Sequence, residues 1–141
     1  MTAPSPLVRR MTVDRERGVC VAFSAKCWGQ LEWNHRSSSG IGGRGHKAPT
    51  LTPADGVMMC TGHNQALESD PAFQSMGKRM GWKLVRNRGS MLATQIPFFN
   101  KSTGVWALPD ELGNADPINT ALALELIDAA GGNYVKGVLS R

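Results

Sequence analysis

The chain carries two pairs of residues that can bind a soft metal ion. Cys20 and Cys27 are separated by six residues, and Cys60 and His63 are separated by two. Two such pairs, if they converge, make the closed four-ligand site in which proteins hold structural zinc. A metal ion would stabilise a small domain whose hydrophobic core is limited. The alternative is that Cys20 and Cys27 are small buried residues and that His63 lies on the surface.

The composition is that of a small basic protein. A length of 141 residues suits one domain, and the net charge of +5 favours an anionic partner such as nucleic acid, although a basic protein without such a partner is equally compatible. Three cysteines fit metal ligands or free thiols in a reducing compartment better than disulfides. No apolar run is long enough to span a membrane, and the N-terminus lacks the apolar core of a signal peptide. We therefore expect a cytoplasmic protein.

The residue pattern predicts an α+β fold. Residues 31–35 alternate apolar and polar side chains, which predicts a strand with Trp33 and His35 on one face and Asn34 on the other. A long loop rich in glycine, serine and proline follows at 37–53. We further expect a polar lead-in at 1–17 that is mostly irregular or contains a short helical turn, and a short strand or knuckle at 19–23. A turn is expected at 53–56, helices at 61–69, 71–80 and 117–130, a strand at 82–86, and a hairpin that pairs 96–99 with 104–108.

The segment LEWNHRSSSGIGGRGHKAPTLTPADGVMMCTGHNQALES resembles the HNH, or ββα-metal, endonucleases, and in particular those of actinobacteriophages. Three features carry the resemblance: an HRxxxGxGG loop, a P-x-[ND]-G turn and a CxxHN knuckle. The later segments GWKLVRN, IPFF and GVWALPDELG extend it, so that it covers roughly residues 18–113. It implies a small ββα-metal core stapled by a zinc knuckle and followed by a β-hairpin, with a C-terminal helix and tail at 114–141.

The resemblance also implies a function, which is the metal-dependent hydrolysis of phosphodiester bonds in DNA by a phage-encoded enzyme in the host-cell cytoplasm. His35, at the end of the first strand, would be the general base, because imidazole titrates near neutral pH. Asn34 and Asn64 would offer oxygen atoms to a catalytic Mg²⁺ or Mn²⁺. Asp55 would order the loop or orient His35. Three cations would contact DNA phosphates, namely Arg36, Arg44 and Lys47.

Two residues depart from the family pattern. Asn34 stands where the family usually has Asp or His, and Asp55 stands where it has Asn. A neutral amide is a weaker metal ligand than a carboxylate, so two other functions stay open. One is a DNA-binding protein of the same zinc-stapled fold that is catalytically weak or inactive. The other is a small protein-interaction module that uses the apolar helix at 117–130. A homodimer is compatible with each of these functions.

Overall fold

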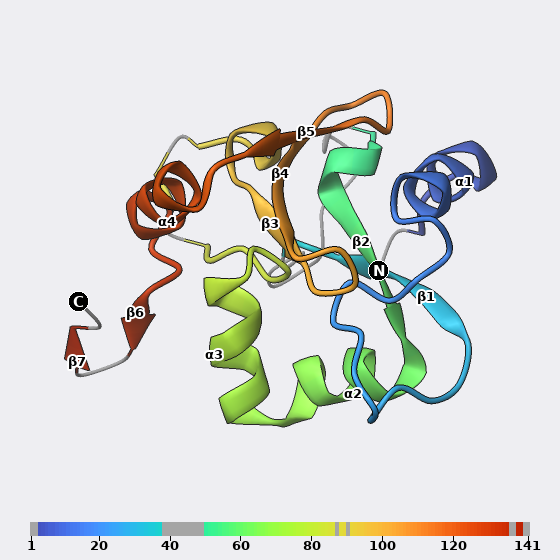
Figure 1. The fold of residues 1–141 in the computed structure, drawn as a ribbon, viewed down its shortest axis with the longest axis horizontal. Helices are drawn as coiled ribbons and strands as arrows, with labels where there is room; N and C mark the ends of the chain where they lie inside the picture. Colours follow the sequence, from blue (N-terminus) through green and yellow to red (C-terminus); the bar gives the residue numbers. More distant parts are fainter. Residues whose placement is uncertain (1–2, 38–49, 87, 90, 136–137, 140–141) are drawn as a thin grey trace.

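The computed structural model describes residues 3–37, 50–86, 88–89, 91–135 and 138–139. These residues form a mixed α+β protein with small antiparallel sheets, as predicted (Figure 1). The helices are α1 (Pro6–Arg15), α2 (Thr61–Ser69), α3 (Pro71–Arg79) and α4 (Thr120–Ala129), with short 3-10 helices η1 (Pro53–Asp55) and η2 (Ala93–Gln95). The strands are β1 (Leu31–His35), β2 (Gly56–Cys60), β3 (Phe98–Asn100), β4 (Val105–Pro109), β5 (Ala115–Ile118), β6 (Tyr134–Val135) and β7 (Val138–Leu139).

Strands β1 and β2 form an antiparallel hairpin that leads directly into helix α2. Leu31 pairs with Cys60 at one end of the hairpin, and His35 pairs with Gly56 at the other. Every residue of β2 is buried. Helix α2 begins at Thr61, immediately after β2, so it starts at the end of the hairpin where β1 begins. The helices predicted at 61–69 and 71–80 are confirmed, the second ending one residue early as α3.

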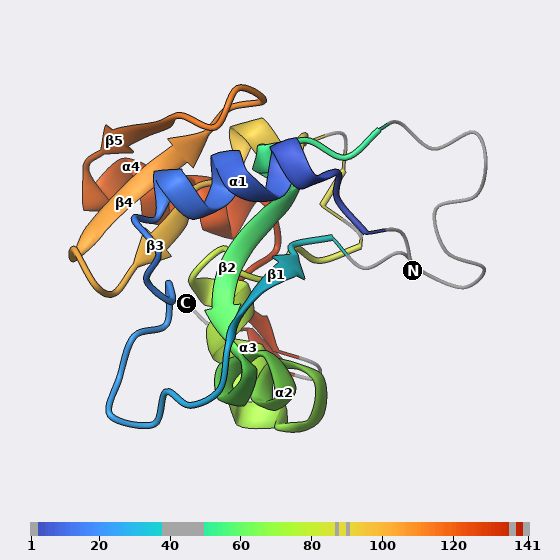
Figure 2. The same ribbon diagram turned by 90° about the vertical axis from the view of Figure 1, so that its right-hand side faces the viewer.

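The N-terminal segment contains a ten-residue helix, so the prediction of an irregular lead-in at 1–17 is wrong. Helix α1 lies across β2 (Figure 2), and polar side chains hold it there. Thr12 Oγ1 accepts a hydrogen bond from Nε1 of Trp33 at 3.0 Å. The guanidinium of Arg15 donates to the carbonyl of Gly56 at 2.7 Å. These bonds exist only once the hairpin has formed, so the periodicity of α1 alone does not reveal the helix.

The second half of the chain packs a three-stranded sheet, in the order β3-β4-β5, against helix α4. The hairpin predicted at 96–108 is confirmed as β3 and β4, with Phe98 opposite Ala107. The helix predicted from residue 117 begins instead at Thr120, because Pro117 belongs to β5 and pairs with Ala107. No helix in the described residues has both the length and the apolar content needed to cross a membrane.

Two buried clusters form most of the core. One joins the hairpin, the preceding turns and α2 around Trp82, and the other packs Ala123 and Ile127 of α4 against the second sheet. The strand predicted at 82–86 is wrong. In the described part of that segment, the only bridge joins Leu84 to Ser37. The segment is irregular because no neighbouring strand continues the pairing, and it contributes Trp82 and Leu84 to the core.

Candidate metal centre

Four side chains from separate parts of the chain converge in the structure. The ligand atoms of Cys20, Cys27, Cys60 and His63 all lie within 4.8 Å of one another. Cys20 and Cys27 lie in the turns before β1, Cys60 ends β2, and His63 lies in the first turn of α2. All three cysteines are free, and His63 is only 7% exposed. The predicted convergence is confirmed, and the cluster could hold a metal ion such as zinc.

The imidazole of His63 presents Nδ1 to the three sulfur atoms. Nδ1 lies 3.6 Å from Sγ of Cys20, 3.5 Å from Sγ of Cys27 and 3.2 Å from Sγ of Cys60. Zinc bonds of about 2.3 Å to sulfur and about 2.05 Å to nitrogen, at a tetrahedral angle, separate ligand sulfur and nitrogen atoms by about 3.5 Å. Nε2 lies 3.2 Å from Oγ of Ser24. The hydroxyl of Ser24 can accept a hydrogen bond from Nε2–H, which leaves Nδ1 unprotonated and able to bind a metal.

Burial and hydrogen bonding adjust the charges of the cluster. Burial raises the pKa of the Cys20 thiol to about 12. Burial also acts to raise the pKa of Cys60, but backbone N–H groups and the neighbouring thiols outweigh it, so that this pKa is lowered. The pKa of His63 is lowered, chiefly by burial. A thiolate at Cys60 and a neutral imidazole at His63 are the states in which these side chains bind a metal.

A polar cluster beside the metal centre includes a residue that the sequence interpretation missed. Glu32 accepts from Oγ1 of Thr61 at 2.7 Å and from Nδ2 of Asn64 at 2.8 Å. These two hydrogen bonds, that of Thr61 first, lower the pKa of Glu32. The alternation of apolar and polar residues in β1 puts Glu32 on the same strand face as Asn34. That pattern in the sequence could have identified Glu32 as a candidate site residue. Glu32 is three residues, or roughly 10 Å of strand, from His35.

Two predicted catalytic residues, Asn34 and His35, lie at the other end of β1. The ring of His35 packs edge-on against Trp33 with 4.8 Å between centroids, which confirms that these two residues share a strand face. Asn34 is buried, and its Nδ2 donates to the carbonyl of Trp82 at 3.1 Å. The amide of Asn34 is therefore already committed to the core.

Arg36 is fully buried, so its predicted contact with DNA phosphates is wrong. Its guanidinium donates at 2.7 to 3.3 Å to the carbonyl oxygens of five residues, namely Ala54, Gly81, Ala93, Ile96 and Pro97. These bonds use all five N–H donors of the side chain. Burial lowers the pKa of the Arg36 guanidinium to about 9, which still leaves it protonated at neutral pH. Arg36 is a structural residue.

Asp55 orders the turn before β2. Its Oδ2 accepts from the backbone N–H of Thr52 at 2.8 Å and from Oγ1 of Thr52 at 3.4 Å, in a capping box around η1. This is one of the two roles that the sequence predicts for Asp55. The two remaining predicted DNA contacts, Arg44 and Lys47, lie outside the described residues.

Comparison of the chain with protein-family models, with curated proteins and with solved structures finds no significant match. The metal cluster and the polar residues beside it are therefore interpreted from their own geometry and chemistry.

Proposed function

We propose that the chain is a zinc-stabilised HNH (ββα-metal) endonuclease that hydrolyses phosphodiester bonds in DNA. One observation carries the proposal: the β1–β2 hairpin continues into α2 without an intervening residue, and the Cys₃His cluster joins hairpin and helix. The resemblance of the sequence implies this order of elements, with Asn34 and His35 on the first strand and Asn64 on the helix. The cluster itself would hold structural zinc, since its spacing suits a tetrahedral ion.

The catalytic ion would be Mg²⁺ or Mn²⁺, bound near the start of α2. Glu32 and Asn64 present oxygen donors of the kind that hard divalent ions prefer, and Glu32 adds the negative charge that Asn34 and Asn64 lack. Asn34, the other expected ligand, donates to Trp82. When bound, the ion would neutralise charge that develops on the phosphate.

His35 would act as the general base that takes a proton from the attacking water. The net charge of +5 favours association with DNA. The three free cysteines suit a reducing cytoplasm, which would be that of the host cell if a phage encodes the protein.

A catalytically weak or inactive DNA-binding protein is the second candidate. Burial of Asn34 and its hydrogen bond to Trp82 favour it, because a ligand side chain that is committed to the core is not available to an ion. The position of His35, at the end of the hairpin away from α2, favours it as well. Such a protein would still bind structural zinc and DNA but would not hydrolyse DNA.

Nicking of supercoiled plasmid with Mg²⁺ or Mn²⁺ separates the two candidates. The endonuclease proposal expects ion-dependent nicking that falls about 10²–10⁴-fold in His35→Ala, with zinc content unchanged and no recovery at higher Mn²⁺. Asn64→Ala should also lose activity but recover part of it as Mn²⁺ is raised. Gln65→Ala, an exposed neighbour on α2, is the matched control and should nick normally.

Each alternative outcome has a definite meaning. Absence of nicking by the unmodified protein, with DNA binding intact, would establish the second candidate. Equal recovery of His35→Ala and Asn64→Ala with Mn²⁺ would make His35 a ligand and not the base. Normal nicking by His35→Ala would remove it from the reaction.

A further inference from the structure

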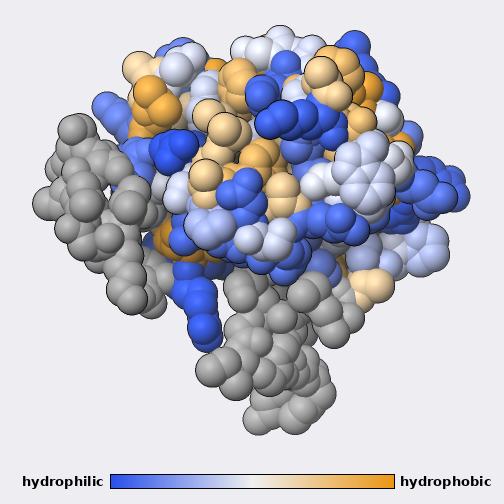
Figure 3. All heavy atoms as spheres, turned by 90° about the horizontal axis from the view of Figure 1, so that it is seen from below, coloured by the Kyte–Doolittle hydropathy of each residue, from blue (hydrophilic) through white to orange (hydrophobic). Residues whose placement is uncertain are grey.

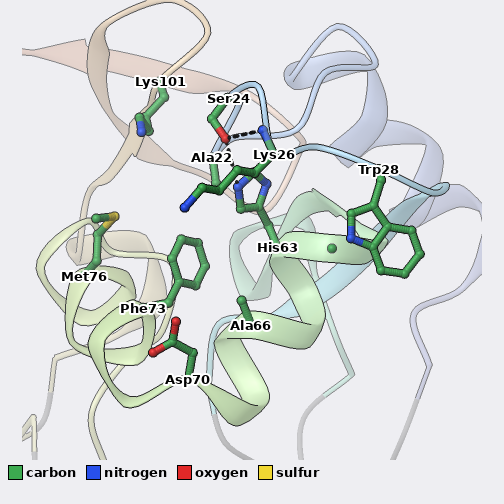
Figure 4. Close-up of a pocket in the computed structure, with 11 residues that line it drawn as sticks. Ala22, Ser24, Lys26, Trp28, His63, Ala66, Asp70, Phe73, Met76 and Lys101 are labelled. Atoms are coloured by element: carbon green, nitrogen blue, oxygen red, sulfur yellow. Dashed lines mark hydrogen bonds between the residues drawn. The ribbon is translucent and has the colours of Figure 1, made fainter.

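A pocket of about 450 Å³ opens beside the metal cluster, and the proposed cleavage site does not use it (Figure 4). The turns around Ala22 to Trp28 form one side, helices α2 and α3 form another, and Lys101 closes the rim. On the face that carries α2 and α3, apolar atoms gather near the middle and hydrophilic residues surround them (Figure 3). The volume is within the range of small-ligand sites, about 300–1,000 Å³.

The pocket has an exposed aromatic wall. Trp28 is 57% exposed, whereas the other three tryptophans of the chain are at most 9% exposed. Its indole lies against Gly62, where a Cβ would come within 2.4 Å of the indole nitrogen. Phe73, which also lines the pocket, stacks on His63 with 5.4 Å between ring centroids and 20° between planes. Two of the lining rings are therefore packed against the start of α2.

The charged side chains of the lining favour an anion at one side. Lys26 and Lys101 are exposed, and neither forms an ion pair with a described residue. Asp70 is the one acidic side chain of the lining, and its Oδ1 caps α3 by accepting from the N–H of Ala72. The lining thus has an excess of one positive charge.

The backbone at the start of α2 does not supply an anion site of its own. The N–H groups of Thr61 and Gly62 already donate to the carbonyls of Gln30 and Trp28, and that of His63 donates to a sulfur atom. An anion in this pocket would therefore be held by the two lysines.

We infer that this pocket binds one unstacked nucleotide of single-stranded nucleic acid, with Trp28 stacking on the base and Lys26 and Lys101 holding its phosphates. Exposed aromatic rings beside unpaired cations are the elements with which proteins bind single strands. A duplex hides the faces of its bases, so it does not fit the same lining. The inference stands apart from cleavage, because Glu32, His35 and Asn64 do not line the pocket.

The test is anisotropy of a short fluorescein-labelled oligothymidylate, titrated with zinc-loaded protein in buffer without Mg²⁺ or Mn²⁺. Trp28→Ala should weaken binding about tenfold. Trp28→Phe retains a ring and should recover most of that loss. Replacing Lys26 and Lys101 together by Ala should reduce the slope of log affinity against log salt by about 1.4, or about 0.7 for each phosphate contact. Zinc content should be unchanged in every variant.

Arg10→Ala combined with Arg86→Ala is the control for lost charge, since both arginines are exposed and neither lines the pocket. It should leave the slope nearly unchanged. An oligouridylate is titrated in the same way, and dependence of either oligonucleotide on Trp28 supports the inference. An affinity for oligothymidylate that is unchanged in Trp28→Ala would overturn the inference. So would equal, Trp28-dependent binding of a duplex or of polyglutamate. Because neither Mg²⁺ nor Mn²⁺ is present, failure here leaves the cleavage proposal untouched.

Discussion

Arg36 carries a positive charge inside the protein, and every hydrogen bond that its guanidinium donates goes to a carbonyl group. A buried charge costs several kcal/mol unless hydrogen bonds replace its water. Four of its five carbonyl partners, at Gly81, Ala93, Ile96 and Pro97, come from the segments that follow α3. The side chain therefore ties the end of β1 to the second half of the chain.

We predict that Arg36→Lys lowers the free energy of unfolding by about 3 kcal/mol. An ammonium group has three donors on a compact centre and cannot reach five carbonyls, so two or more are left without a donor. Urea denaturation should show the midpoint shifting with little change in the slope. Arg10→Lys, at an exposed position of α1, should change stability by less than about 0.5 kcal/mol. Equal stability of Arg36→Lys and the unmodified protein would contradict this account.

Elements whose signal is local were predictable from the sequence. The metal cluster follows from ligand type and spacing, since Cys60 and His63 fall on the same turn. Helix α3 follows from Pro71 at its first turn and the stop at Gly81, whose φ is +75°. The β3–β4 hairpin follows from a turn segment between two apolar runs.

Elements that depend on distant partners were not predictable. The apolar residues of helix α1 form no periodic face, and the burial of Glu16 at its C-cap is explained by a distant partner, the N–H of Met58, which donates to its Oε1 at 2.6 Å. Arg36 follows directly after a strand and looks like a surface cation until its distant carbonyls are in place. The apolar run at 82–86 suggests a strand, but the fold offers it a partner only at Ser37.

The metal cluster leads to a prediction about the hairpin–helix element. We expect one zinc per chain, and removal of zinc by a chelator or by Cys27→Ser should abolish the cooperative thermal transition of this element. Structural zinc contributes roughly 10–16 kcal/mol at pH 7, which exceeds what a small core supplies. Elemental analysis and melting curves followed by circular dichroism measure both effects.

Ser24→Ala is the matched control for Cys27→Ser. It removes the hydrogen bond to Nε2 of His63 and the one that Oγ accepts from the N–H of Lys26, but no metal ligand, so zinc should still bind, with an affinity lowered by roughly 10–100-fold. Structural zinc would be ruled out if protein purified without chelator contains no zinc and melts identically with and without chelator.

On the scale of the whole molecule, the two proposed nucleic-acid contacts come from different parts of the sequence. The pocket is lined by residues between Ala22 and Lys101 that include α2 and α3, whereas Arg44 and Lys47 follow β1 in the sequence and lie outside the described residues. If the pocket is specific for single strands, and Arg44 and Lys47 contact duplex phosphates, substitutions at the two sites should affect binding of different substrates.

We therefore predict opposite effects of two double variants on salt dependence. Replacing Arg44 and Lys47 by Ala should reduce the slope for duplex DNA by up to about 1.8, because each phosphate contact contributes about 0.9. It should leave oligothymidylate binding nearly unchanged. Replacing Lys26 and Lys101 should do the reverse. Arg36 is left intact in this experiment, because its substitution would change the stability of the protein. Equal losses on both substrates in both variants would mean that the net charge of +5 attracts nucleic acid without a defined contact site.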